Sequence, residues 1–275
     1  MGGCRATIYS LNSCLGCREK RFLPSEIQVE LHDLLKNYRT GRPPEKAFKL
    51  IGEDLDTPAF DVATVEELCR SIDSLKLNAV PVVLAHHNLL PQVLQRTALY
   101  TEVINGGILR SRLAACKHSV IYCHGHIHDD LIELVMRPGK DADKLVCVSA
   151  PEVIDGFSVI TIEFGHSGAR LGCIVTAMRV QKDGSVSEQE PRRVPFHEGG
   201  FAADLIHPRL REVWNSFPKD DFRAGTVFEQ LGKEGAKMHT ETFSDILLEA
   251  EWFRMIDITD RDHDVRYWTV RRRVP

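Results

Sequence analysis

Long apolar runs are missing from this sequence of 275 residues. No stretch approaches the roughly 18 consecutive apolar residues that a membrane-spanning helix needs. The first residues also lack the charged-then-apolar pattern of a secretory signal. We therefore expect a cytoplasmic protein with no membrane partner.

An excess of positive charge and a regular cysteine framework are missing as well. The formal net charge is -4, which argues against a protein that coats nucleic acid. The eight cysteines are irregularly spaced, so buried thiols are a better interpretation than disulfides. Cys14 and Cys17 form a CxxC without a second pair, which is only a weak signal for zinc.

The apolar spacing predicts a mixed α/β fold. Strands are expected at 5–13, 79–85, 119–123, 144–149, 157–164, 172–180, 255–258 and 265–271, and helices at 25–38, 62–75, 94–115, 207–216, 225–232 and 240–253. The helix at 94–115 is interrupted by Gly106-Gly107, and Thr64 is the expected cap of the helix at 62–75.

The composition shifts after Pro195, which predicts a large domain at 1–196 and a small module at 197–275. Helices followed by two strands in this module resemble the final part of a winged helix. Residues 201–275 hold twelve Lys and Arg against fourteen Asp and Glu, so no broad basic face is available for nucleic acid. We expect this module to contact a protein partner. The run Arg271-Arg272-Arg273 is interpreted as a solvated tail.

Two of the predicted strands end in histidine. The strand at 79–85 leads into His86 and His87, and the strand at 119–123 leads into the sequence HGHIH at 124–128. Ligand sites of open α/β folds gather at the carboxyl edge of the sheet. Neutral imidazoles bind zinc, manganese and iron. The glycine at 125 favours a sharp turn in which His126 and His128 face one pocket.

The segments VPVVLAHHNLLP, YCHGHIH and KLVCVSAPEV together resemble the second half of the calcineurin-like metallophosphoesterases, in the branch similar to cyclic-nucleotide phosphodiesterases, over residues 5–196. The resemblance implies half of a β-sandwich flanked by helices. It also implies that His86 and His126 bind one metal and that His128 binds a second. His87 and His124 would support these ligands or face solvent. Asn88, which stands where the family often has proline, is a further candidate to support them.

In the family, two divalent ions (Mn, Fe or Zn) activate a water that attacks a phosphodiester or phosphomonoester. This sequence lacks the Asp-x-His, Gly-Asp-x-x-Asp and Gly-Asn-His motifs that supply the other ligands. We therefore expect at most one metal here and little activity from this chain alone. A truncated gene, a mis-set start codon or a fragment would explain the missing motifs. The alternative is a non-catalytic binding or regulatory protein with half of the fold. A mononuclear zinc hydrolase is disfavoured because no HExxH is present.

Overall fold

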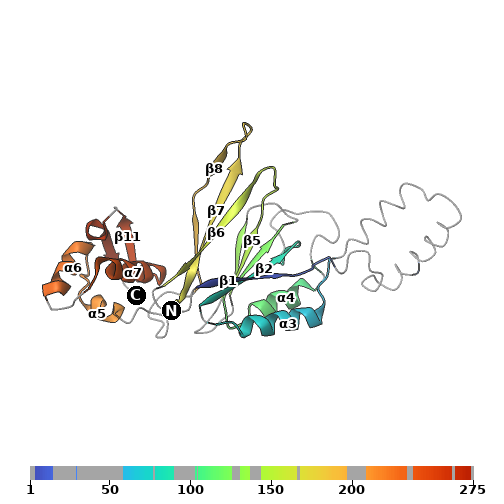
Figure 1. Ribbon diagram of the computed structural model, residues 1–275, viewed down its shortest axis with the longest axis horizontal. Coiled ribbons are helices and arrows are strands. Elements are labelled where there is room, and N and C mark those ends of the chain that lie inside the picture. Colours follow the sequence, from blue (N-terminus) through green and yellow to red (C-terminus); the bar gives the residue numbers. More distant parts are fainter. Residues whose placement is uncertain are drawn as a thin grey trace.

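The computed structural model describes residues 4–14, 29, 58–76, 78–89, 103, 105–125, 131–136, 144–165, 168–196, 209–233, 238–261 and 264–273. Within these ranges the chain is a mixed α/β protein in which two sheets pack face to face and a smaller unit lies beside them (Figure 1). None of the helices in these ranges is long and apolar enough to span a bilayer.

The first sheet has five strands in the order β1-β2-β3-β5-β4. Its parallel strands are β1 (Arg5–Ser10), β2 (Ala79–Ala85), β3 (Val120–His124) and β5 (Lys144–Ser149). The edge strand β4 (Ile132–Met136) runs antiparallel to β5, and the sequence analysis did not predict it. The apolar runs of β2, β3 and β5 are typical of strands that are buried on both faces.

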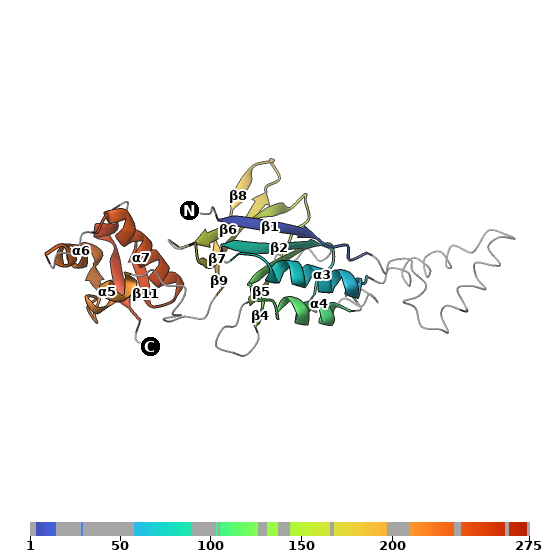
Figure 2. The same ribbon diagram turned by 60° about the horizontal axis from the view of Figure 1, so that its bottom comes forward.

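Two helices cover one face of this sheet, α3 (Val62–Asp73) and α4 (Gly106–Leu113) (Figure 2). The prediction that Thr64 caps α3 is wrong. The Asp61 carboxylate accepts a hydrogen bond from the Thr64 amide at 2.8 Å, so Asp61 is the N-cap and Thr64 is the residue that it caps. The helix α4 begins at Gly106, and the expected helical residues 94–102 lie outside the described ranges. The same holds for nearly all of the expected helix at 25–38.

The second sheet is antiparallel and packs on the other face of the first. It contains β6 (Gly156–Phe164), β7 (Arg170–Val180), β8 (Val186–Glu188) and β9 (Arg192–Pro195), with both β8 and β9 paired to β7. A buried apolar cluster fills the space between the sheets, and it includes Val80, Ile121, Val146, Cys173 and Val175. The first sheet therefore has a helical layer on one side and a second sheet on the other.

The C-terminal part combines helices with a small sheet, as the sequence predicts. Its helices are α5 (Leu210–Asn215), α6 (Ala224–Lys233) and α7 (Thr240–Trp252), and its sheet has the order β10-β12-β11, with β10 (Phe222–Arg223), β11 (Ile256–Asp260) and β12 (Thr269–Arg272). The strand predicted at 265–271 is partly wrong. A 3-10 turn occupies Val265–Tyr267, and the Asp264 carboxylate accepts a hydrogen bond from the Arg266 amide there.

The expected tail at Arg271-Arg272-Arg273 is wrong as well, although the side chains of Arg271 and Arg273 are exposed to solvent as expected. Arg271 lies in β12 and makes two hydrogen bonds to the Asp221 carboxylate, each 2.8 Å long. This ion pair holds the pKa of Asp221 below its ordinary value. The guanidinium of Arg272 stacks over the Trp214 ring at 4.3 Å from its centroid. The arginines thus join the hairpin to the rest of the C-terminal part.

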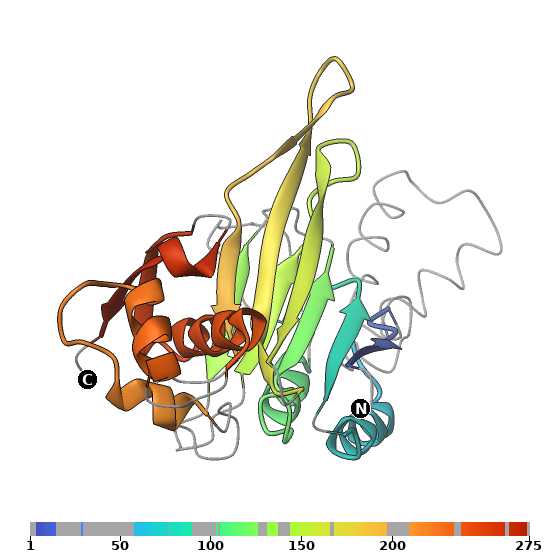
Figure 3. The ribbon, with the colours of Figure 1, turned by 60° about the vertical axis from the view of Figure 1, so that its left-hand side comes forward.

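The helix α7 lies across β7 (Figure 3). A Cβ atom added to Gly172 in β7 would come within 2.5 Å of the Trp252 ring, so the helix and the strand are in direct contact. Leu171 belongs to the apolar cluster of the C-terminal part. The second sheet is therefore sandwiched between the first sheet and α7.

Candidate functional site

The two strand ends that carry histidine meet at one edge of the first sheet. The strands β2 and β3 are parallel neighbours, and Ala85 is in register with His124. The next residue after Ala85 is His86, whose carbonyl accepts a hydrogen bond from the Gly125 amide at 3.1 Å. This bond joins the segment that begins at His86 to the start of the HGHIH segment.

His86 has an exposed side chain at this edge. Its Nδ1 atom lies 3.8 Å from where a Cβ atom on Gly125 would stand, so the imidazole is beside the beginning of the HGHIH segment. That distance is ordinary van der Waals contact, and Gly125 is not among the described glycines with a positive φ. The expectation that Gly125 itself makes a turn only glycine allows is therefore not supported by its conformation.

His87 is buried beneath His86 and is held by Ser13, which follows β1. The Ser13 hydroxyl oxygen lies 3.2 Å from the amide nitrogens of both His86 and His87, and 2.9 Å from His87 Nδ1. Because a hydroxyl has two acceptor positions and one hydrogen, it accepts from both amides and donates to Nδ1. We infer that His87 is neutral, with its proton on Nε2.

Tyr122, fully buried in β3, holds the same turn from below. Its hydroxyl group donates a hydrogen bond of 2.7 Å to the His87 carbonyl. Burial raises the pKa of the Tyr122 phenol far above its ordinary value, so the group stays protonated and remains a donor. His86 and His87 are thus fixed through their backbone by Ser13, Tyr122 and Gly125.

Replacing Tyr122 with phenylalanine is expected to lower the free energy of unfolding by roughly 1–3 kcal/mol, because a buried carbonyl loses its donor. The matched control is Tyr267→Phe, at an exposed tyrosine, where a change within about 0.5 kcal/mol is expected. Urea unfolding of both variants measures the difference. Equal stabilities would mean that the bond from Tyr122 to His87 contributes nothing.

His124 and Asn88 are also buried. The Nδ1 atom of His124 is 3.1 Å from the Gly125 carbonyl oxygen, and the His124 carbonyl accepts from the Ala150 amide at 2.8 Å. Burial of His87 and His124 excludes the solvent-facing alternative that the sequence left open for these two residues. They lie behind His86, where they can support it.

The structure brings His86, His87, Asn88 and His124 to one edge. His126 and His128 lie outside the described residues, so their predicted roles as ligands stay predictions. Among the residues that are described, no group of three or more His, Cys, Asp or Glu side chains is arranged to hold a metal ion.

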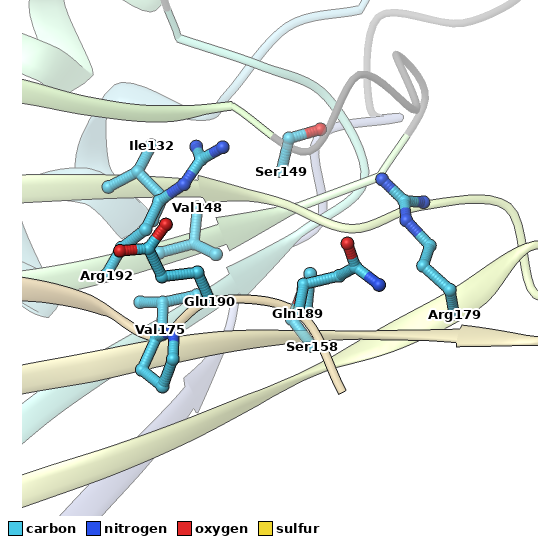
Figure 4. Close-up of a pocket in the computed structure, with 11 residues that line it drawn as sticks. Ile132, Val148, Ser149, Ser158, Val175, Arg179, Gln189, Glu190 and Arg192 are labelled. Carbon is cyan, nitrogen blue, oxygen red and sulfur yellow. The ribbon is translucent and has the colours of Figure 1, made fainter. Parts of the chain in front are cut away.

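A cavity of about 410 Å³ lies at the same edge, between the two sheets (Figure 4). Ser149, which is in register with His124, lines it from the first sheet. Arg179 and Arg192 line it from the second sheet and reach toward Ser149 from opposite sides, and the Glu190 carboxylate lies beside Arg192. Its floor is apolar and includes Val148 and Val175. Guanidinium groups are well suited to pair with an anionic ligand.

Four residues at this edge are not among those predicted from the sequence: Ser13, Tyr122, Arg179 and Arg192. Ser13 had a usable signal, since it follows a predicted strand and the carboxyl ends of parallel strands meet at one edge. Tyr122 lies within an apolar run and is typical of a core residue. The arginines carry no motif, and only the packing of β7 and β9 brings them to the cavity.

The described residues form a mixed α/β protein with a histidine-bearing sheet edge beside a cavity lined by arginine. Neither the family models nor the curated protein sequences match this chain. The resemblance to calcineurin-like metallophosphoesterases therefore rests on the residues themselves and stays a prediction.

Proposed function

We propose that this chain carries the histidine part of a metal-dependent phosphoesterase that hydrolyses a phosphodiester or a phosphomonoester. The observation that carries the proposal is the junction of β2 and β3. There the exposed His86 and the start of the HGHIH segment lie side by side, joined by the hydrogen bond from Gly125 to the His86 carbonyl.

The donor set suits a zinc-like divalent ion. His86 would be one ligand, and His126 and His128, which follow Gly125 in the sequence, would be the others. A metal ion bound there supplies positive charge to a phosphoryl oxygen and lowers the pKa of a bound water. Three neutral ligands without a carboxylate suit one ion rather than a pair, so we expect at most one metal per chain.

The chain's own residues would position the substrate and hold the ligand. Arg179 and Arg192 can pair with phosphate oxygens in the cavity, since guanidinium groups match phosphate geometry. The apolar floor can receive the organic part of the ester. Ser13 and Tyr122 fix the backbone that carries His86, so this turn does not have to be ordered when the ion binds.

The test is metal content by elemental analysis together with hydrolysis of bis-p-nitrophenyl phosphate in the presence of manganese. It compares the wild-type chain with His86→Ala and with a control, His239→Ala. His239 is exposed before α7 and its side chain makes no capping bond. We expect the wild type and the control to bind up to one metal per chain and to hydrolyse the ester slowly. The His86→Ala variant should lose the metal and the hydrolysis.

Equal metal content in His86→Ala and the wild type would refute the site. Metal that depends on His86, without any hydrolysis that depends on it, would favour the alternative of a non-catalytic binding protein. Two metals per chain with rapid turnover would mean that acidic ligands come from residues the sequence analysis did not recognise.

A further inference from the structure

A second chemically distinct feature lies in the helical layer, away from the histidine edge. Cys69 is in α3, and Cys116 follows the end of α4. The two cysteines are neighbours in the apolar cluster beneath the first sheet, and the Cys116 thiol donates a hydrogen bond of 3.5 Å to the Arg112 carbonyl. They remain slightly exposed, Cys69 by 9% and Cys116 by 5%.

Contacts on both sides of this pair hold α3 and α4 in register. On one side, Glu66 of α3 forms an ion pair with Arg112 of α4 at 2.7 Å. On the other side, the Asp73 carboxylate accepts a hydrogen bond of 2.7 Å from the Lys117 amide. The thiols therefore lie between two other contacts that join the same two segments.

The electrostatic setting of Cys69 differs from that of the other buried cysteines. The side-chain interaction with the neighbouring Cys116 lowers the pKa of the Cys69 thiol, although burial and the charges of Glu66 and Asp73 oppose this. By contrast, burial raises the pKa of Cys147 and of Cys173 to about 12. Cys69 is thus closer to its reactive thiolate form than the cysteines in the strands.

We propose that Cys69 and Cys116 are a redox modification site, at which a hydroperoxide converts the two thiols into an intramolecular disulfide. The Cys69 thiolate attacks one oxygen of the peroxide, the O–O bond breaks, and Cys69 becomes a sulfenic acid. When the oxidant is hydrogen peroxide, the other oxygen leaves as water. The Cys116 sulfur then attacks the Cys69 sulfur and expels a second water. Two thiols are oxidised and one peroxide is reduced. The low exposure of both sulfurs favours a small oxidant of this kind.

The test treats the folded chain with hydrogen peroxide, blocks the remaining thiols with N-ethylmaleimide and digests the product without reduction. The chain carries Ser in place of the exposed cysteines, Cys4 and Cys14, and of Cys17, to prevent cross-linking between chains. We expect a peptide pair joined through Cys69 and Cys116, and dithiothreitol should separate it. The oxidised chain should melt at a higher temperature than the reduced chain, because the cross-link restricts the unfolded state.

The linked pair should be absent in Cys69→Ser and in Cys116→Ser, and it should remain in the control Cys147→Ser. Two independent serine variants keep the test informative if one of them folds poorly. Sulfinic acid on either cysteine without a cross-link would overturn the proposal. Thiols that stay unmodified would also overturn the proposal. The same is true of a disulfide between other cysteines that forms in comparable yield.

Discussion

The Gly172→Ala variant is expected to lose about 3 kcal/mol of unfolding free energy, at the upper end of the usual cost of overpacking, because the added methyl group has no room. A Cβ atom at Gly172 would lie 2.5 Å from the Trp252 ring and 2.5 Å from the Val194 carbonyl oxygen. The ring can shift, but the carbonyl belongs to β9, which is paired to β7. The substitution therefore strains the second sheet and its contact with α7 together.

Urea unfolding monitored by tryptophan fluorescence measures this effect directly, because all three tryptophans (Trp214, Trp252 and Trp268) lie in the C-terminal part. The matched control is Gly232→Ala in α6, where a Cβ atom would meet nothing within 4 Å. Since alanine favours a helix more than glycine does, the control should gain up to about 1 kcal/mol. A Gly172→Ala chain as stable as the wild type would show that α7 does not rest on β7 in solution.

The Phe243→Ala variant is expected to lose about 3–5 kcal/mol, the usual cost of removing a fully buried phenylalanine. Phe243 has 0% exposure in α7, and its ring centroid lies 5.3 Å from that of Phe228. The cluster around it holds the helices of the C-terminal part against their small sheet. Its loss should leave a cavity that the surrounding rings fill only in part.

The control for this variant is Phe157→Ala in β6, where the ring is 49% exposed. A loss below about 1 kcal/mol is expected there, since only the strand preference and a small contact area change. The fluorescence transition of Phe243→Ala should move to lower urea concentration than that of Phe157→Ala. Equal transitions would contradict the buried position of Phe243.

The spacing of apolar residues along the sequence is sufficient to predict much of the fold. The valine-rich run at 79–85 and the run at 119–123 predict β2 and β3, because a strand buried on both faces needs apolar residues throughout. The edge strand β4 escapes prediction because its residues are only partly buried and it follows directly on the histidine segment. The 3-10 turn at Val265–Tyr267 resembles a strand in sequence because its composition, Val-Arg-Tyr, favours one.

The site is predictable only where a pattern exists. His86 can be found because a charged or polar residue at the end of an apolar strand stands out. The placement of Ser13 beneath His87 depends on β1 pairing with β2 across a long stretch of chain, which local spacing does not encode. The same reason applies to Arg179 and Arg192, whose approach to Ser149 depends on how the two sheets face each other.

The parallel pairing of β1 has a kinetic consequence. Within the described residues its hydrogen-bonded neighbour is β2, and Arg5 pairs with Ala79. Such distant pairing must overcome the entropy of closing a long loop before it gains any contact, which slows folding. During synthesis β1 emerges well before its partner, whereas the helices and hairpin of the C-terminal part are made from neighbouring segments. We expect the attachment of β1, which also brings Ser13 to the histidine turn, to be among the slow steps of refolding.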